Sequence, residues 1–400
     1  MADIQPIKQH TSISEPVTSR AQPLIHNLFP GEIDVSERFQ AAWRSAIRRT
    51  RLAGTEVPDT GAGELRSAIA RRLGASRGLL INPSDVIVTA GTAESIMLVA
   101  SALDLAGGAT VGLENPGYPR TAAVFRMAGA NIQALPVTRD GLDAEALTRH
   151  AAELSAVAVS PSHQYPLGHR MPVSSRQQLI SLSQMHNFTI IEDDYDSEFR
   201  YEAPPLPPLA TLHGPVIYLG TFSKLLTSEL RVAYIVAKGD NLEAIQRARS
   251  ILGATVALPI QLAIADLIES GELDANASRQ KRRYARRRRL VEEQLRSAPG
   301  VRHISGLDAG LHVTLELEPD IAAARVQTEL RHQGIVVGTL DDCRVDAGHG
   351  AQGLIVSYSG HDTDILRTCI AKIRHALLQE EGLTSTAGSQ PGELETRSAS

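Results

Sequence analysis

One lysine of this 400-residue chain lies where a lysine can do chemistry. Lys224 follows the apolar run VIYLGTF closely, and only five of the 40 basic residues are lysine. A lysine amine can lose its proton and attack a carbonyl group, whereas arginine stays protonated. Thr221, Ser223 and Arg231 add two hydroxyls and a guanidinium that could hold a phosphate at the same strand end. The segment predicts an amine nucleophile beside an anion site; the alternative is an ordinary strand-to-helix turn with a surface lysine.

An acidic cluster ends another apolar strand. Glu192, Asp193 and Asp194 follow the run FTII, and Tyr195 comes next. Carboxylates at such a position are costly unless a cation faces them. A metal ion is one solution, but no convergent histidines accompany the cluster. A protonated pyridine nitrogen is another, with Tyr195 reaching the neighbouring phenolate oxygen, and a helix-capping acidic turn is the structural alternative.

Three other turns carry groups that could complete a binding site. Gly91, Thr92 and Ala93 lie between an expected strand and an expected helix. Their N–H groups, with the helix dipole behind them, predict an anion site. Tyr118 follows a Pro-Gly turn and could stack on a planar ring, with Arg120 nearby. The string SPSHQYPLG also places polar groups after a strand.

The elements that position these groups alternate between short apolar strands and amphipathic helices up to about residue 240. This alternation is typical of a parallel sheet covered by helices on both faces. A long helical stretch follows, from about residue 241 to 297, and then a smaller mixed portion. The predicted fold class is α/β: a large, mostly parallel sheet domain flanked by helices, with a smaller α+β C-terminal domain.

Composition excludes several classes of protein. Hydrophobic residues make up 42% of the chain and charged residues 21%, which is typical of a globular protein. Two cysteines cannot build a disulfide framework or a four-thiolate zinc site. We expect no membrane span, no signal peptide and a cytoplasmic location. A net charge of −5 argues against nucleic acid as a partner, so the basic run at 279–290 is interpreted as a solvated helix face.

Together these segments resemble the fold-type I aminotransferase family that depends on pyridoxal 5'-phosphate (PLP). They are most similar to the aminotransferase-like domain of its MocR/GabR-type branch. The strings that carry the resemblance span about Asn115 to Arg231, and weaker similarity extends from Leu28 to Leu273. They are NPGYPRTAAVFRMAGA, SPSHQYPLG, IIEDDYDSEFRY and VIYLGTFSK.

The resemblance implies a role for each matching residue. Lys224 would form the Schiff base (aldimine) with PLP and move the α-proton, and Asp193 would pair with the pyridinium nitrogen. Asp194 is the nearest rival for that pairing. Tyr195 would bond the ring's phenolate oxygen, and Tyr118 would pack on the ring. The implied phosphate ligands are Gly91, Thr92, Ala93, Thr221, Ser223 and Arg231.

The implied substrate contacts are less regular. Arg120 matches a family arginine near the substrate, while Tyr165 stands where many aminotransferases have an asparagine. The strand at 353–360 lacks the arginine that often binds the substrate carboxylate, which leaves Arg344 as the nearest candidate. The common Tyr-Gly-Asp-Pro-x-Gly turn is replaced at 56–61 by EVPDTG. A turn that lost its tyrosine puts one phosphate contact in doubt.

The resemblance also implies how the chain is divided. About 25 residues precede the LFP segment, so we expect the branch's winged helix-turn-helix to be lacking. The expected parts are a flexible N-terminal arm (1–25), an N-terminal segment packing on the small domain (26–54), a large PLP-binding domain (55–240), an interdomain helix with the small C-terminal domain (241–380) and a disordered tail (381–400).

The expected function is that of a PLP-dependent aminotransferase with no metal site. It would move an amino group from an amino acid or amine to a 2-oxo acid, as a homodimer. One alternative is another PLP reaction, such as racemisation, elimination or an oxidative reaction. The other is a regulatory protein that binds PLP without catalysis.

Overall fold

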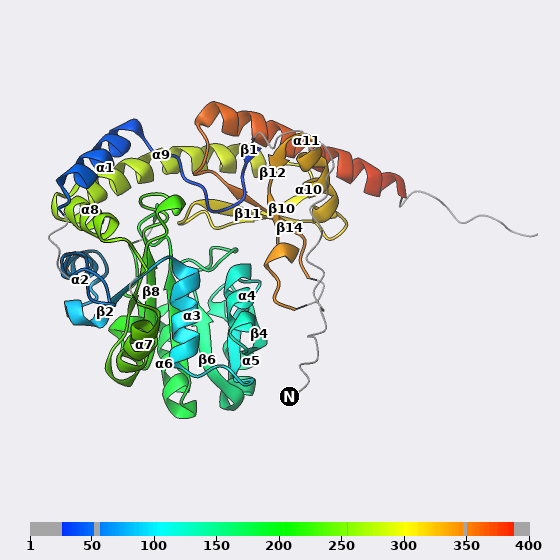
Figure 1. The fold of residues 1–400 in the computed structure, drawn as a ribbon. Helices are drawn as coiled ribbons and strands as arrows, with labels where there is room; N and C mark the ends of the chain where they lie inside the picture. The colour runs from blue at the N-terminus through cyan, green and yellow to red at the C-terminus, as the bar shows by residue number, and fades with distance from the viewer. Residues whose placement is uncertain (1–25, 52–56, 203, 254, 347–349, 388–400) are drawn as a thin grey trace, which may run out of the picture.

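The computed structural model (Figure 1) describes residues 26–51, 57–202, 204–253, 255–346 and 350–387. Its larger part is built on one eight-stranded sheet. The strands are β2 (Val86–Thr89), β3 (Thr110–Asn115), β4 (Asn131–Thr138), β5 (Gly141–Leu142), β6 (Leu154–Val159), β7 (Thr189–Asp194), β8 (Val216–Thr221) and β9 (Ala233–Val236).

The strand order of this sheet is β2-β9-β8-β7-β6-β3-β4-β5. Strands β4, β3, β6, β7 and β8 run parallel, so their carboxyl ends meet at one edge of the sheet. Strand β9 is antiparallel to both of its neighbours, and β5 is antiparallel to β4. The predicted α/β class with a large, mostly parallel sheet is confirmed.

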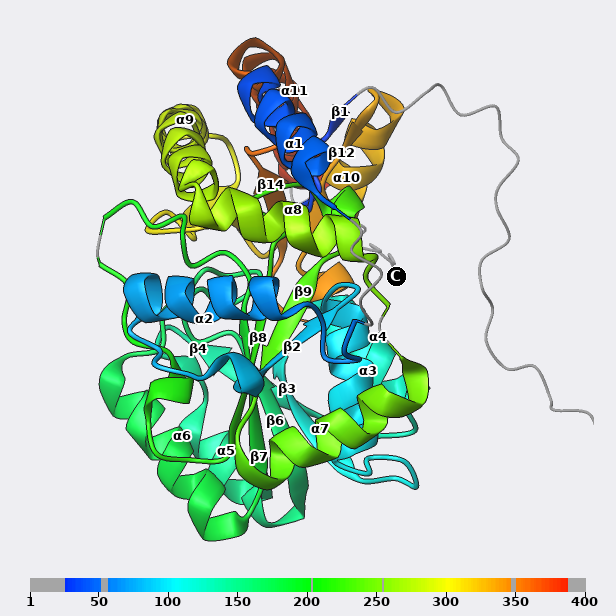
Figure 2. The ribbon, with the colours of Figure 1, turned by 60° about the vertical axis from the view of Figure 1, so that its left-hand side comes forward.

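Helices cover both faces of this sheet, because successive strand residues point to opposite sides. Ile191 of β7 packs in the core beneath α3 and α4, whereas Ile190 packs in the core beneath α5 and α6. In Figure 2, α2 lies beside β2, and α7 lies beside α3. These helices are α2 (Gly63–Arg77), α3 (Thr92–Ala102), α4 (Pro119–Met127), α5 (Ala144–His150), α6 (Val173–His186) and α7 (Gly239–Leu252).

Helix α7 lies with the large sheet, whereas the sequence pattern places residues from 241 onward in the second unit. Ile245 packs among the residues beneath α3, and α7 runs beside that helix. The difference arises because the helix directly after β9 still carries an apolar face toward the sheet. The change of composition near residue 240 thus follows the last strand of the large sheet, and one more helix packs on that sheet after it.

A smaller antiparallel sheet forms the second unit, with strand order β10-β11-β14-β13. A two-residue strand, β1 (His26–Asn27), pairs in parallel with β12 (Ile335–Val336) beside it. The other elements of this unit are β10 (Val301–Ser305), β11 (His312–Leu317), α10 (Ala323–His332), β13 (Gly338–Thr339), β14 (Gly353–Ser357) and α11 (Thr363–Ala387).

The last helix continues past the point where a disordered tail is expected. Helix α11 reaches Ala387, so residues 381–387 are helical. Glu380, at the expected end of the ordered chain, is buried and pairs with Arg325 of α10 at 2.7 Å. This anchor, with no proline to stop the helix before Ala387, explains the extension. Residues 388–400, like the expected arm at 1–25, lie outside the described residues.

Three helices link the two units, α1 (Glu37–Arg49), α8 (Leu258–Glu269) and α9 (Glu272–Leu295), and they pack on one another in Figures 1 and 2. The basic run expected to be a solvated face lies on α9. Arg287 and Arg288 of that run are instead buried and ion-paired. Within the described part of the chain, no helix is both long and apolar enough to span a bilayer.

Candidate active site

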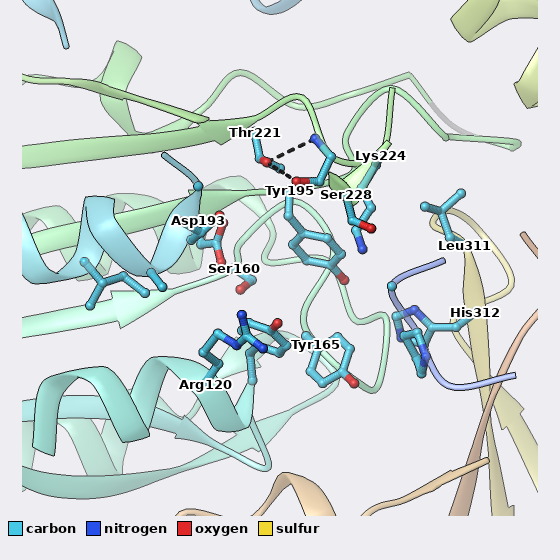
Figure 3. A pocket seen from close by; sticks show the side chains of 18 of the residues that line it. Arg120, Ser160, Tyr165, Asp193, Tyr195, Thr221, Lys224, Ser228, Leu311 and His312 are labelled. Carbon is cyan, nitrogen blue, oxygen red and sulfur yellow. Dashed lines mark hydrogen bonds between the residues drawn. The ribbon is translucent and has the colours of Figure 1, made fainter. Parts of the chain in front are cut away.

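A pocket of about 410 Å³ opens at the carboxyl ends of β7 and β8 (Figure 3). The N-terminus of α3 forms one wall, and Leu311 and His312 of the second unit reach in from the opposite side. The pocket brings together all of the predicted site residues except Arg344. They are Gly91, Thr92, Ala93, Tyr118, Arg120, Tyr165, Asp193, Tyr195, Thr221, Ser223, Lys224 and Arg231.

The lysine and one aspartate come from adjacent parallel strands. Asp193 of β7 is in register with Leu219 of β8, and Lys224 follows the end of β8. Burial lowers the pKa of Lys224, while Asp196 and Asp193 act in the opposite direction. Burial, with the charges of Asp194 and Asp196, raises the pKa of Asp193 to about 7. The pocket therefore holds an amine that loses its proton readily and a carboxyl group that favours a cationic partner.

The neighbouring Asp194 belongs to a different environment. Its carboxylate is buried on the other face of β7, where it pairs with Arg77 of α2 at 2.9 Å. Tyr218 and Ser197 donate hydrogen bonds to the same oxygen at 2.6 and 3.0 Å. Asp194 does not line the pocket, so Asp193 is the carboxyl group available to a ligand there.

One end of the pocket is suited to an anion. Gly91 precedes α3 with φ 95°, which turns the chain so that the first N–H groups of the helix face the pocket end. The Thr221 and Ser223 hydroxyls lie 2.9 Å apart beside it. Arg231 has a left-handed backbone conformation (φ 51°), and its guanidinium lies 3.5 Å from the position that a Cβ on Gly91 would occupy. Helix dipole, hydroxyls and guanidinium thus converge on one site.

Aromatic side chains line the rest of the pocket. The Tyr118 and Tyr165 rings meet edge to face with centroids 5.3 Å apart. Tyr165 is buried, and the Cys343 side chain is a hydrogen-bond partner of its hydroxyl. The Tyr195 hydroxyl lies 3.0 Å from Nδ1 of His163. These aromatic side chains therefore form a wall suited to a planar ring.

Arg344 lies outside the pocket, which corrects its assignment as a substrate residue. It pairs with Asp341 at 3.1 Å, three residues away on the same turn. That turn contacts the loop after β3, where the Cys343 carbonyl accepts a hydrogen bond from Gly117 at 2.8 Å. In this structure Arg344 is therefore engaged by a local ion pair outside the pocket lining. Glu56, in the turn that replaces the common tyrosine motif, lies outside the described residues.

Several lining residues were missed by sequence reasoning. His312 begins β11, and its Nε2 donates a hydrogen bond to the Pro166 carbonyl at 3.1 Å. Burial lowers the pKa of His312 to about 3, so its ring is neutral. No local motif marks it, because it enters the pocket from a strand of the second unit. The remaining missed residues are Phe29, Pro30, Gly31, Ile96, Ser160, Ser228 and Leu311.

Comparisons with known proteins agree with this geometry. The aminotransferase class I and II family model matches residues 28–392. The HTH-type pyridoxine biosynthesis transcriptional regulator PdxR of Corynebacterium glutamicum is 34% identical over 373 residues, which is 92% of this chain and 79% of that protein. The 2-aminoadipate transaminase of Thermus thermophilus is 28% identical over 306 residues, covering 74% of each chain.

A solved structure has the same fold. The α-aminoadipate aminotransferase LysN of Thermus thermophilus, in complex with N-(5'-phosphopyridoxyl)-L-leucine, matches with a TM-score of 0.81. The match covers 90% of this chain and 94% of that chain at 24% identity. The aspartate-aminotransferase-like fold, PLP fold type I, is thereby confirmed.

The family match confirms PLP as the cofactor, and the residues present fit it. The anion site suits its phosphate, the raised pKa of Asp193 suits a cationic ring nitrogen, and the lowered pKa of Lys224 suits attack on its aldehyde. The resemblance to the aminotransferase-like domain of the regulators is confirmed as well. The chain belongs to the aminotransferase class I and II family.

Proposed function

We propose that this protein is a PLP-dependent aminotransferase that moves an amino group from an amino acid or amine to a 2-oxo acid. The observation that carries the proposal is the arrangement of Lys224 and Asp193 at adjacent strand ends, in one pocket with an anion site. An amine of lowered pKa next to a carboxyl group of raised pKa is a pairing of acid–base groups that enzymes use.

The side chains divide the work by position. When bound, the cofactor supplies an electron sink for the bonds of the substrate's α-carbon. Lys224 Nζ would take the α-proton and deliver it to the cofactor carbon that carries the amino group, and Asp193 would hold a proton at the ring nitrogen. Tyr195 would donate a hydrogen bond to the ring oxygen, and Tyr118 would pack on the ring. The phosphate would be held by Gly91, Thr92, Ala93, Thr221, Ser223 and Arg231.

Two groups are available to the substrate. Arg120 is a cation on the pocket wall and would bind a carboxylate. Tyr165 lines the pocket beside Tyr118 and would pack against the substrate. The cation of Arg120 supports an amino acid as donor.

A regulatory protein that binds PLP without turnover is the second candidate. It is favoured by the 34% identity to a transcriptional regulator. In that case the same residues would bind an amino compound, and the protein would then stop before releasing an oxo acid. Racemisation, elimination and oxidation remain alternatives within enzymology, and they differ in product.

A single-turnover experiment separates these functions. The purified protein, loaded with PLP, is mixed with a panel of amino donors, and the products are identified by mass spectrometry. Pyridoxamine phosphate with the matching oxo acid supports transamination. A donor that binds and is recovered unchanged supports the regulatory function, and any other product supports another PLP reaction.

Lysine variants test the role of Lys224 separately. Lys224→Ala and Lys224→Arg should both lose the covalent link to PLP, detected by borohydride reduction and peptide mass spectrometry. The control Lys238→Ala changes an exposed lysine near the start of α7 and should keep the link. A link that survives in Lys224→Ala would overturn the assignment.

We also expect a homodimer, since enzymes of this fold type form their sites at a dimer interface. Light scattering should give twice the 43.0 kDa mass of the chain. A monomer that retains turnover would contradict this expectation.

A further inference from the structure

A buried polar group lies directly behind the pocket. His163 and Asp196 are 2% and 1% exposed, and His163 Nδ1 lies 2.8 Å from Asp196 Oδ2. The same nitrogen lies 3.0 Å from the hydroxyl of Tyr195, which lines the pocket. One imidazole nitrogen is therefore within hydrogen-bond distance of both a carboxylate and a phenol, but it can carry only a single proton.

The carboxylate decides where that proton is. A carboxylate oxygen only accepts hydrogen bonds, so Nδ1 must carry the proton that it gives to Asp196. A bare Nδ1 would direct its lone pair at the carboxylate 2.8 Å away, which is repulsive. With Nδ1 protonated, the Tyr195 hydroxyl has no acceptor on His163. Its own proton is free to turn toward the pocket.

The other ring nitrogen supports the same tautomer. His163 Nε2 is buried without a hydrogen-bond partner among the described residues. Two glycines, Gly168 (φ 71°) and Gly310 (φ 83°), pack against it so closely that a Cβ on either would lie 2.9 or 2.8 Å from Nε2. Since no acceptor from the described part of the chain meets Nε2, a proton there would be an unpaired buried N–H, which is costly. The ring is best satisfied with its proton on Nδ1.

Other groups around Tyr195 keep it protonated. Burial raises the pKa of Tyr195 well above its ordinary value, and the charges of Asp196 and Asp193 and the nearby Glu114 of β3 act in the same direction. Tyr165 faces it from the loop after β6, with ring centroids 6.3 Å apart. Tyr195 thus has a proton to give throughout the neutral range.

We propose that Asp196, acting through His163, holds the hydroxyl proton of Tyr195 toward the pocket, where Tyr195 donates it to the ring oxygen of the bound cofactor. Asp196 and His163 are positioning residues, since neither lines the pocket. The inference rests on the proposed role of Tyr195 at the cofactor. It does not depend on whether the protein completes a transamination.

The test measures the pKa of the lysine-linked cofactor from its visible absorbance between pH 5 and 10, without an amino donor. A hydrogen bond from Tyr195 stabilises the anionic ring oxygen, so Tyr195→Phe should raise this pKa by about one to two units. In Asp196→Asn, a neutral amide oxygen accepts from Nδ1–H more weakly than the carboxylate does, so the ring proton is held less firmly on Nδ1. Tyr195 then donates to His163 part of the time, and the cofactor pKa should rise by less than in Tyr195→Phe.

The double variant separates an effect of Asp196 that passes through Tyr195 from a direct effect of the Asp196 charge on the cofactor. If Asp196 acts through Tyr195, adding Asp196→Asn to Tyr195→Phe should not raise the pKa further, because loss of the Asp196 charge near Lys224 lowers the pKa. A rise as large as in the protein that keeps Tyr195 would show that Asp196 does not act through Tyr195, and the proposal would fail. It would also fail if Asp196→Asn left the pKa unchanged.

Two variants of His163 provide a second test should Asp196→Asn fold poorly. His163→Asn keeps an N–H donor near the position of Nδ1 and should retain a pKa near that of the unchanged protein. His163→Leu removes it and leaves the Asp196 carboxylate free to accept from Tyr195, so the cofactor pKa should rise toward that of Tyr195→Phe. Equal pKa values in His163→Asn and His163→Leu would overturn the proposal. Asp85→Asn, a buried capping aspartate before β2, is the matched control. Absence of the cofactor band in the unchanged protein would instead contradict the proposed function.

Discussion

Two buried carboxyl groups, Asp193 in the pocket and Glu114 beside it, resist ionisation because the fold buries them. Burial raises the pKa of Glu114 to about 8, and the nearby Asp193 adds to the shift. Glu114 Oε2 accepts a hydrogen bond from the Ser160 N–H at 3.1 Å, and the Gln164 side chain contributes another. These hydrogen bonds do not replace the water that the carboxylate has lost. In the cofactor-free protein, ionisation of either group therefore lowers the free energy of unfolding.

The consequence is a fall in stability with rising pH. Between about pH 4.5 and 8 the folded protein keeps a proton on Glu114 that the unfolded chain has released. The free energy of unfolding should then fall by up to about 1.4 kcal/mol per pH unit from this group. Glu114→Gln keeps an acceptor for Ser160 and should remove that slope. Urea unfolding of the cofactor-free protein from pH 5 to 9 measures it.

The free energy of unfolding of Glu114→Gln, relative to that of the unchanged protein, should increase with pH up to about pH 8. Above that pH the difference between the two proteins should stay constant. Glu153→Gln, an exposed glutamate before β6, is the control and should not alter the slope. A constant difference between Glu114→Gln and the unchanged protein across the pH range would contradict the assignment.

At the scale of elements, α7 supports the turn that forms the anion site through an ion pair and hydrogen bonds. Arg249 of α7 is fully buried and pairs with Glu94 in the first turn of α3 at 3.0 Å. It also donates a hydrogen bond to the Val88 carbonyl at 2.6 Å. Glu94 in turn accepts from the Ala90 N–H. These bonds hold the chain on both sides of Gly91.

Loss of the Arg249 guanidinium should lower both the stability of the protein and its affinity for the cofactor. Arg249→Leu leaves the Glu94 carboxylate without its cation, which should lower the free energy of unfolding by about 3 to 5 kcal/mol. PLP affinity, measured by equilibrium titration, should fall because the first N–H groups of α3 are no longer held in place. Arg247→Leu, two residues away, removes an exposed pair with Glu243 at 3.8 Å and should cost less than about 1 kcal/mol. Similar losses of stability and of PLP affinity in both variants would show that Arg249 does not support the turn before α3.

At the scale of the whole molecule, the N-terminal segment ties the pocket to the second unit. Leu28 accepts a hydrogen bond from the Ser357 N–H of β14 at 2.8 Å, and residues 29–31 line the pocket directly afterwards. Asp34 then pairs with Arg287 of α9 at 2.6 Å and with Arg283 at 3.3 Å. The long helix between the units thus fixes the segment that closes one side of the site.

Loosening this attachment should affect substrate binding more than the chemical step. Asp34→Asn leaves the buried Arg287 guanidinium without a carboxylate and should lower the free energy of unfolding by about 3 kcal/mol. KM for the amino donor should rise several-fold while kcat changes less, because Asp34 lies away from Lys224. Glu37→Gln, at an exposed position three residues later, is the control. A loss in kcat with KM unchanged would contradict this role.

Much of the fold and most of the site can be predicted from the sequence, and the reason is local. Strand and helix periods are properties of short segments, and parallel strands bring their carboxyl ends to a common edge. Lys224 and Asp193 follow or end two such strands, so their meeting required no knowledge of side-chain packing. Gly91 before a helix is likewise a candidate for an anion site that a few adjacent residues suggest, and it stays a prediction.

By itself the sequence determined which groups stand at strand ends, and the resemblance of its motifs to a known family implied the cofactor. Only the tertiary structure decided how buried charges are shared. Asp194, on the face of β7 opposite to Asp193, is paired with Arg77, which is 117 positions away, and Arg344 is paired within its own turn. His312 reaches the pocket from the second unit. A buried polar group must find a partner, and which partner it finds depends on segments that only folding brings together.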